Sequence, residues 1–458
     1  MRDLLPHQKT GLSYCLSVSD PALIMQMRLG KTLLAIRYAQ ALEDREDCRR
    51  VLVTAPVTVL GAWRRELSLE EEVYLDLRVH PKSKWGDLLL QAWESKHRVW
   101  TLANHEAIRS LPQLGLVPWN IAIVDESTVI KNPKSKITKV YTSTFRQAQH
   151  RMILSGLVAP ESYLDLFCQY QFLNGVFLGC HNYWDFRAQF FAPGGWKGYE
   201  YYPIPGAREK IQKHLQDRAF VLTRQQAGIG SRKILSQRTV EMNTLQRDLY
   251  RTIVKKAAYQ REDASWNETQ WAPIVQLWLS RIAGGFDPEG KTLISDAKVK
   301  ELLYLLSEDL RGEQLMIWFH FRAELEHVRQ TLSGKGFKLG CIHGGVLDKD
   351  RDKVLDAFTS RKIQIILATQ KSLRYGRDCS ISDTAIYYSN EWSCELRMQS
   401  EDRIINPLQK QPKLLIDLVT EETVDEDVSE RVRDKAFNAN YILTKHIDKI
   451  SRSLIRKR

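Results

Sequence analysis

The sequence predicts an α/β protein with two parallel-sheet lobes and a mainly helical insertion between them. Short β-type runs alternate with longer helical segments over about residues 20 to 155, and again from about residue 297 onward. Strands that alternate with helices favour a parallel sheet covered on both faces. The chain has 458 residues, 43% of them hydrophobic, which suits two or three compact units with buried cores.

The predicted strands are short apolar or β-branched runs bounded by turn residues. In the first half they are Ala22–Met25, Arg50–Ala55, Val99–Leu102, Ile121–Val124 and Met152–Leu154. In the second half they are Gln314–Phe319, Lys338–Ile342, Ile363–Ala368, Thr384–Tyr388 and Lys413–Leu418.

The intervening segment, from Glu161 to about Gly290, reads differently. It is rich in aromatic residues and helical patterns and poor in convincing strands. The expected boundaries are 1–160 for the first lobe, 161–290 for the helical insertion and linker including a return to the first lobe, and 291–458 for the second lobe.

Charge and cysteine usage narrow the class of protein. Lys plus Arg outnumber Asp plus Glu by 67 to 55, a net charge of +12, which favours a polyanionic partner such as nucleic acid. A solvated basic surface would give the same balance. The seven cysteines form no C-x-x-C pair, so neither a disulfide framework nor a zinc site is predicted. Without a signal-peptide pattern or a membrane-length apolar run, a cytoplasmic protein with no membrane partner is expected.

A candidate phosphate-binding loop follows the first predicted strand. The apolar run from Leu23 turns through Gly30-Lys31-Thr32 into a segment with helical spacing. Backbone N–H groups and the positive end of such a helix face phosphates, with a lysine as a point charge and a hydroxyl on Mg²⁺. Lys31 would therefore hold the β- and γ-phosphates and Thr32 the metal. Met25 stands where the full pattern has glycine, so a chance strand–turn–helix fits this stretch equally well.

Two carboxylates end another predicted strand. Ile121–Val124 leads directly into Asp125 and Glu126. In an α/β nucleotide site, the carboxyl end of a strand is where a metal-holding acid and a water-orienting acid belong. We expect Asp125 to reach Mg²⁺ through its water shell and Glu126 to orient the attacking water.

The stretch from Asp125 through Asn132 resembles the DEAHRIKN signature of Swi/Snf-type ATPases, the branch of the superfamily-two helicases that translocates on double-stranded DNA. Further segments match the family in the same order along nearly the whole chain. They are Leu5-Pro6-His7-Gln8, Thr54 through Trp63 and Glu66, Ser155-Gly156, Tyr183–Phe186, Phe220–Arg224, Gln246–Tyr250, Phe319, His343-Gly344, Arg351, Gly376, Asp378 and Gln399–Arg403. The resemblance implies two RecA-like lobes that bind ATP and Mg²⁺ and move along DNA.

The resemblance also implies roles for individual residues, and the Thr54–Glu66 segment is expected to face DNA. The implied catalytic residues are Lys31, Asp125, Glu126 and Arg403, with Thr32 and Asp125 at Mg²⁺. The implied ATP-binding residues are Gln8, the adenine contact, with Arg28, Leu29, Gly30, Lys31, Thr32 and Gly376. The implied DNA-binding residues are Arg64, Arg65, Lys131, Asn132, Arg351 and Lys371.

Several positions depart from the family pattern. Ser127-Thr128 replaces Ala-His, and Leu157-Val158 replaces Thr-Pro. In the last motif Arg403 is followed by Asn406 where a second arginine is usual. An arginine that stabilises charge in phosphoryl transfer is worth roughly 10³-fold or more in rate. Slower hydrolysis is therefore expected unless Arg374 or Arg377 takes its place.

These features together predict an ATP-dependent translocase on duplex or branched DNA, acting in replication, recombination or repair beside proteins of those processes. The compact size resembles bacteriophage members of the family, which would place it in the host cytoplasm. Two alternatives stay open. One is a degenerate, weakly hydrolysing or non-catalytic DNA-binding clamp, favoured by Asn406. The other is an RNA-directed helicase, which the helical insertion and the Ile130-Lys131-Asn132 extension argue against.

Overall fold

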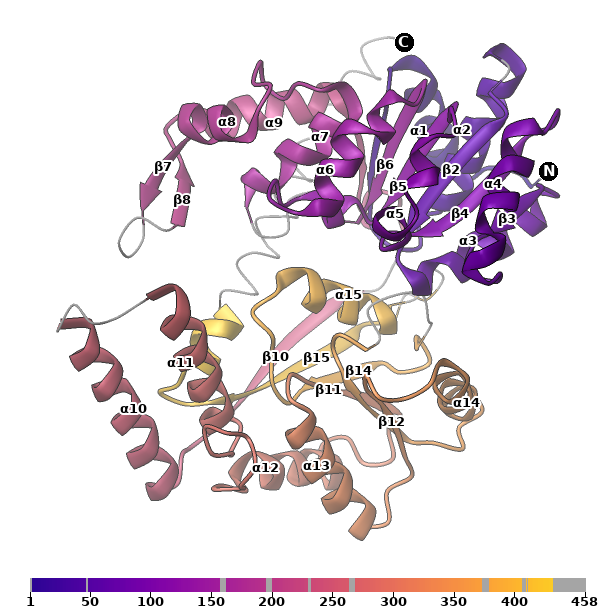
Figure 1. Ribbon diagram of the computed structural model, residues 1–458. Helices are drawn as coiled ribbons and strands as arrows, with labels where there is room; N and C mark the ends of the chain where they lie inside the picture. Colours follow the sequence, from indigo (N-terminus) through magenta and orange to yellow (C-terminus); the bar gives the residue numbers. More distant parts are fainter. Residues whose placement is uncertain are drawn as a thin grey trace. The chain divides into compact units, whose positions relative to one another are not determined.

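The computed structural model describes residues 2–46, 48–156, 162–194, 200–229, 232–262, 268–372, 379–405, 409 and 411–430 (Figure 1). These residues form two compact units that divide between Ile229 and Gly230, called unit 1 and unit 2 below.

Unit 1 is built on a seven-stranded sheet with the order β3-β4-β2-β5-β6-β1-β9. Every neighbouring pair in it is parallel. Its strands are β1 (Ala22–Met25), β2 (Arg50–Ala55), β3 (Tyr74–Asp76), β4 (Val99–Asn104), β5 (Ile121–Asp125), β6 (His150–Ser155) and β9 (Ala219–Leu222). The α-helices between them are α1 (Pro6–Ser17), α2 (Lys31–Glu46), α3 (Val57–Leu69), α4 (Trp85–Glu94), α5 (Ala107–Ser110) and α6 (Lys136–Ser143).

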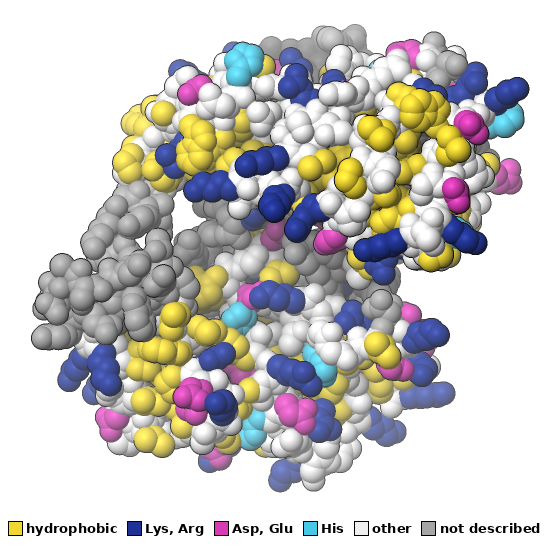
Figure 2. Space-filling view, viewed as in Figure 1, with side chains coloured by type: hydrophobic (Ala, Val, Ile, Leu, Met, Phe, Trp, Pro, Cys, Tyr) yellow, Lys and Arg dark blue, Asp and Glu magenta, His cyan; other side chains and the backbone are white. Residues whose placement is uncertain are grey.

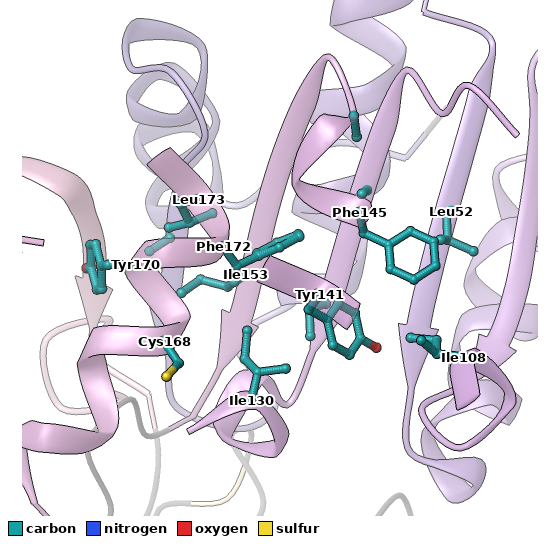
Figure 3. Close-up of a cluster of buried hydrophobic side chains, with 14 of the residues drawn as sticks. Leu52, Ile108, Ile130, Tyr141, Phe145, Ile153, Cys168, Tyr170, Phe172 and Leu173 are labelled. Carbon is teal, nitrogen blue, oxygen red and sulfur yellow. The ribbon is translucent and has the colours of Figure 1, made fainter. Parts of the chain in front are cut away.

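The two faces of this sheet carry separate buried clusters, because successive side chains of a strand point to opposite sides. Leu23 and Met25 of β1 pack with residues of α1, α2 and α3. Ala22 and Ile24 pack on the other face, with residues of α4, α5 and α6. Figure 3 shows part of the second cluster, in which Phe172 is drawn beside Ile153 of β6 and Phe145 beside Leu52 of β2. Both faces are therefore covered, as expected for a parallel sheet.

The helical insertion of unit 1 comprises α7 (Leu166–Asn174), α8 (Tyr183–Phe190) and α9 (Ala207–Arg218). A two-stranded antiparallel hairpin, β7 (Phe191–Gly194) and β8 (Glu200–Pro203), projects from it (Figure 1). Phe172 of α7, Phe186 of α8 and Ile211 of α9 belong to the same buried cluster as the sheet. The chain then returns to the sheet as β9, which pairs with β1.

Unit 2 has a six-stranded parallel sheet with the order β10-β15-β14-β11-β13-β12. Its strands are β10 (Lys233–Val240), β11 (Leu315–Phe319), β12 (Leu339–Ile342), β13 (Ile365–Thr369), β14 (Thr384–Tyr387) and β15 (Lys413–Thr420). Helices α12 (Ala297–Ser307) and α13 (Arg322–Gly334) pack on one face. On the other face lie α14 (Asp348–Thr359) and α15 (Cys394–Ile404). Helices α10 (Thr244–Glu262) and α11 (Glu268–Ala283) pack on each other.

The predicted fold class, two parallel-sheet lobes with helices, is confirmed, and each predicted strand has a counterpart within about two residues at either end. The segment expected to be poor in strands contains β7, β8, β9 and β10. Strand β10 pairs along its whole length with β15, so this strand, which lies in the segment expected to be the insertion and linker, belongs to the sheet of unit 2. Strand β10 lies at the edge of its sheet and most of its side chains are not buried, so its sequence lacks the long apolar run that predicts a strand. In the described residues, no helix combines the length and the apolar character needed to cross a bilayer.

Candidate nucleotide and DNA sites

The candidate phosphate-binding loop lies between β1 and α2. The chain reverses through Arg28 and Gly30, with φ of 69° and 84°, and Lys31 begins α2. The Lys31 ammonium donates a 2.8 Å hydrogen bond to the carbonyl oxygen of Met25. The first N–H groups of a helix have no partner within the helix and carry its positive end. This arrangement suits an anion placed before α2, with Lys31 and Thr32 at its edge.

Gln8 of α1 lies directly against this loop. Its Nε2 donates to the carbonyl oxygen of Leu29 over 3.3 Å, and its Oε1 accepts from the N–H of Leu5 at 2.9 Å. A Cβ on Gly30 would lie 2.1 Å from Gln8 Nε2, so a side chain at position 30 would displace Gln8. The expected adenine contact and the phosphate loop therefore form one packed structure.

Asp125 ends β5, two strands from β1 in the sheet order. Its carboxylate is 4% exposed and accepts two hydrogen bonds, from Trp63 Nε1 at 2.8 Å and from the N–H of Glu126 at 2.9 Å. Burial raises the pKa of Asp125, and the positive charge of Lys31 and the bond from Trp63 oppose that rise. Lys31, which is expected at the phosphates, therefore acts electrostatically on Asp125, which is expected at Mg²⁺. Glu126 follows in a left-handed conformation with φ 53°.

The residues after the acid pair connect it to the helical insertion. Ser127 is fully buried and donates a 2.6 Å hydrogen bond to Gln169 Oε1 of α7. Gln169 Nε2 in turn donates to the carbonyl oxygen of Asp165. The serine that replaces the family alanine therefore links the acid motif to α7 through a buried hydrogen bond.

Trp63 corrects one expectation from the sequence. The segment from Thr54 to Glu66 was predicted to face DNA, but Trp63 is fully buried and its indole holds Asp125. Leu60, Trp63 and Leu67 are the buried residues of α3, a spacing that marks the inner face of a helix. The spacing of these three residues in the sequence could have predicted that Trp63 is buried. The expectation instead followed the resemblance to a DNA-facing motif.

The expected DNA-binding residues of unit 1 lie in two places. Arg64 and Arg65 are on α3, where Arg64 Nε lies 3.3 Å from Asp76 Oδ2 and Arg65 is exposed. Lys131 and Asn132 follow η3 (Ser127–Ile130). Lys131 Nζ lies 3.9 Å from Asp165 Oδ2, and Asn132 is exposed with its Oδ1 accepting from the N–H of Lys134. Arg64 and Lys131 thus already have acidic neighbours.

In unit 2, Lys371 lines a hollow of about 400 Å³ at the carboxyl ends of β11, β12 and β13. Lys371 forms an ion pair with Glu391, another lining residue. Burial favours the neutral form of Glu391, but its bonds to His320 and Lys371 outweigh burial and lower the pKa. Arg351, at the start of α14, donates to the carbonyl oxygen of His343 over 3.3 Å, and His343 lines the same hollow.

Arg403 lies near the end of α15 and is 4% exposed. Helix α15 is fixed by Arg397, whose guanidinium pairs with Asp417, bonds Glu401 at 2.7 Å and stacks 3.4 Å from the centre of the Tyr387 ring. These carboxylates raise the pKa of Arg397 although burial opposes it. The remaining positions singled out in the sequence, namely Leu157, Val158, Arg374, Gly376, Arg377, Asp378 and Asn406, lie outside the described residues.

Comparison with family models gives two matches in chain order. Residues 7–280 match the SNF2-related domain, and residues 297–406 match the helicase conserved C-terminal domain. The chain belongs to the SNF2-related family. The predicted Swi/Snf-type resemblance is thereby confirmed, and this SNF2-related chain carries both halves of a superfamily-two core.

Curated relatives of this SNF2-related chain are distant and much longer. They include the chromatin structure-remodeling complex subunit snf21 of Schizosaccharomyces pombe, 23% identical over 94% of this chain and 38% of its own length. The putative ATP-dependent helicase/translocase YwqA of Bacillus subtilis is 22% identical over 94% of this chain and 48% of its own. The DNA excision repair protein CSB of Oryza sativa is 22% identical over 91% of this chain and 39% of its own. The chain therefore spans less than half the length of these relatives.

Among solved structures, the chain is similar to the Sulfolobus solfataricus SWI2/SNF2 ATPase core in complex with dsDNA. The sequences are 19% identical, the match covers 97% of this chain and 93% of that one, and the TM-score is 0.45.

Proposed function

We propose that this SNF2-related chain is an ATP hydrolase whose cycle drives movement along duplex or branched DNA. Two observations together carry the proposal: the charge of Lys31 acts on the Asp125 carboxylate at the end of β5, and Gln8 packs on the loop before Lys31. A chance strand–turn–helix would not be expected to have both an acid within electrostatic reach of its lysine and a glutamine packed on its loop.

The donor set fits ATP with Mg²⁺. Carboxylate and hydroxyl oxygens are the ligands that this hard cation prefers, and Thr32 with Asp125 would supply them. Lys31 would hold the β- and γ-phosphates, with Arg28, Leu29 and Gly30 as the loop around them, and Gln8 would contact adenine. Bound Mg²⁺ would neutralise charge on the transferring phosphoryl group. Glu126 is proposed to orient water, and Arg403 and Gly376 to act on the same nucleotide.

DNA is the proposed partner because the chain carries a net charge of +12. Contacts to phosphate oxygens do not read sequence and suit a protein that moves along a strand. Arg64, Arg65, Lys131, Asn132, Arg351 and Lys371 are proposed for this task. We further propose a role in replication, recombination or repair, which the name of the CSB relative supports for repair.

Steady-state ATP hydrolysis with duplex, forked or single-stranded DNA, or RNA, tests the proposal. We expect turnover that DNA stimulates and that Lys31→Ala abolishes, while the exposed Lys96→Ala serves as a matched control and leaves turnover unchanged. Stronger stimulation by RNA than by duplex DNA would favour the RNA-directed alternative. DNA binding without turnover would identify a clamp, and gain of turnover in Asn406→Arg would then trace the loss to the missing arginine.

A further inference from the structure

A cluster of two cations and two aromatic rings lies on the helical insertion of unit 1. We call Lys134, Trp184, Arg187 and Tyr201 the insertion cluster. The Arg187 guanidinium carbon lies 4.7 Å from the Trp184 ring centre and 4.3 Å from that of Tyr201. Lys134 Nζ lies 5.6 Å from the Trp184 ring centre. Although both cations contact it, the Trp184 side chain remains 47% exposed.

Three separate elements bring these residues together. Trp184 and Arg187 stand three positions apart on α8, so they lie on neighbouring turns of one helix face. Tyr201 comes from β8 of the hairpin. Lys134 comes from the loop before α6, two residues after Asn132. In Figure 2, yellow and dark-blue side chains lie beside one another over the part of unit 1 that Figure 1 labels α8.

The cations of the insertion cluster have no acidic partner among the described residues. No carboxylate in those parts of the chain forms an ion pair with Lys134 or Arg187, whereas nearby Lys131 lies 3.9 Å from Asp165. The nearest acid on α8, Asp185, is bonded by Asn182, the residue that caps the helix. Within the parts of the chain that the structure describes, the cluster therefore presents positive charge that no carboxylate pairs with.

Aromatic contacts also hold this charge in place. A guanidinium stacked on aromatic rings keeps its N–H donors in the plane between them, where they are available to an anion. Holding the side chain in advance lowers the entropy lost when an anion binds. Phosphate oxygens accept two parallel N–H bonds from arginine, which suits a guanidinium held in this way.

We propose that the insertion cluster binds the phosphate backbone of DNA and extends the DNA contact from Lys131 and Asn132 onto the helical insertion. The inference rests on the proposed function as a DNA motor. Lys134 is the link, because it adjoins the Lys131-Asn132 segment in sequence and contacts Trp184 in space. An acidic protein segment would satisfy the same cations, so the experiment separates that source from DNA.

The test is fluorescence anisotropy of a labelled DNA duplex with the full chain between 50 and 200 mM salt. Each lost phosphate contact should reduce the slope of log affinity against log salt by about 0.9. We expect Arg187→Ala and Lys134→Ala each to reduce the slope by about that amount and to weaken binding roughly threefold to tenfold at low salt. Trp184→Ala should weaken binding by releasing both cations.

The matched control is Trp93→Ala, because Trp93 on α4 is also 47% exposed and no described cation stacks on it. It should bind DNA as the wild type does. If the wild type binds DNA and both Arg187→Ala and Lys134→Ala keep its affinity and slope, the cluster serves another anion and this inference is overturned alone. If the wild type binds no DNA, the proposed function fails and this inference fails with it. Lys134→Ala alters an exposed loop side chain, so it remains a fair test should Trp184→Ala fail to fold.

Discussion

The indole N–H of Trp63 donates a 2.8 Å hydrogen bond to Oδ2 of Asp125, the carboxylate that we propose to reach Mg²⁺. Trp63 also packs 6.0 Å, centre to centre, from the ring of Trp100 on β4. The orientation of an acid at the end of one strand is thus set by a helix that begins after a neighbouring strand. Trp63 therefore positions the Asp125 carboxylate, although an indole takes no part in phosphoryl transfer.

Trp63→Phe should impair the site by leaving Oδ2 of Asp125 without its donor. Removing one partner of a buried hydrogen bond costs about 1–3 kcal/mol, so the free energy of unfolding should fall by about that amount. The lost bond also removes an influence that lowers the pKa of Asp125, so that pKa should rise. We expect the Mg²⁺ concentration for half-maximal ATP hydrolysis to increase, and the acidic limb of the pH–rate profile to move to higher pH.

Trp119→Phe is the control for that prediction. Trp119 is 5% exposed and donates a 2.8 Å hydrogen bond to the carbonyl oxygen of Leu114, distant in the fold from β5's acid pair. It should lose stability to a similar extent and keep its Mg²⁺ dependence. Equal Mg²⁺ dependence in both variants would contradict a supporting role for Trp63.

Gly30→Ala should destabilise the phosphate loop for two reasons that can be separated. The backbone φ of 84° costs a residue with a Cβ about 1–2 kcal/mol, and the new Cβ would lie 2.1 Å from Gln8 Nε2. The double variant Gly30→Ala with Gln8→Ala should recover the steric part and keep the backbone part. Free energies of unfolding of the four proteins, in a double-mutant cycle, measure this coupling.

Gly61→Ala provides the contrast to Gly30→Ala. Gly61 lies within α3, and an added Cβ would have Arg64 Nη2 at 3.8 Å as its nearest neighbour. An alanine there should stabilise the protein by about 0.5–1 kcal/mol. If Gly30→Ala left the free energy of unfolding unchanged or raised it, as expected for Gly61→Ala, the loop would adopt another conformation.

Glu324→Gln should change how the stability of unit 2 depends on pH. Burial raises the pKa of Glu324 to about 7 from 4.5, although Lys298 and Ser389 favour its charged form. Between these pH values the unfolded chain ionises this carboxyl and the folded chain does not, so stability falls as pH rises, by roughly 3 kcal/mol in all. Below pH 4.5 both states are protonated and this loss is absent.

The variant cannot ionise and should therefore gain stability over the wild type as pH rises from 5 to 8, as measured by urea unfolding. Glu326→Gln on the same helix is the control, since Arg329 lowers the pKa of Glu326 to about 2 and the side chain is partly exposed. It should show no gain over that range. A constant difference between Glu324→Gln and the wild type at all pH values would refute the prediction.

Arg397→Met should be among the most destabilising changes in unit 2. It leaves Asp417, which is fully buried, without its guanidinium, and breaking a buried pair in this way costs about 3–5 kcal/mol. Arg397→Lys should cost less, because it keeps the charge but loses the fork and the stacking on Tyr387. Urea unfolding checks the order. Arg329→Met removes an exposed pair with Glu326 and should cost less than about 1 kcal/mol.

Much of the fold was predictable because its signals are local. A buried parallel strand appears as a short apolar run, so β1, β2, β5 and β11 were located nearly to the residue. The candidate phosphate loop and the acid pair could be singled out for the same reason, since each lies at the end of such a run. Strand β10 was missed because an edge strand with one buried residue carries no apolar run.

By itself, the sequence determined the two-lobe α/β class and the family, and it singled out Lys31, Thr32, Asp125 and Glu126 as candidate site residues. These depend on spacing within a few residues. Only the tertiary structure decided that Trp63 holds Asp125, that Gln8 packs on Gly30, and that Lys134 meets Trp184 and Arg187. Each of these contacts joins residues brought together by packing across the sheet or between helices. The periodicity of hydrophobic residues along the chain reports local secondary structure and cannot predict contacts between residues that are distant in sequence.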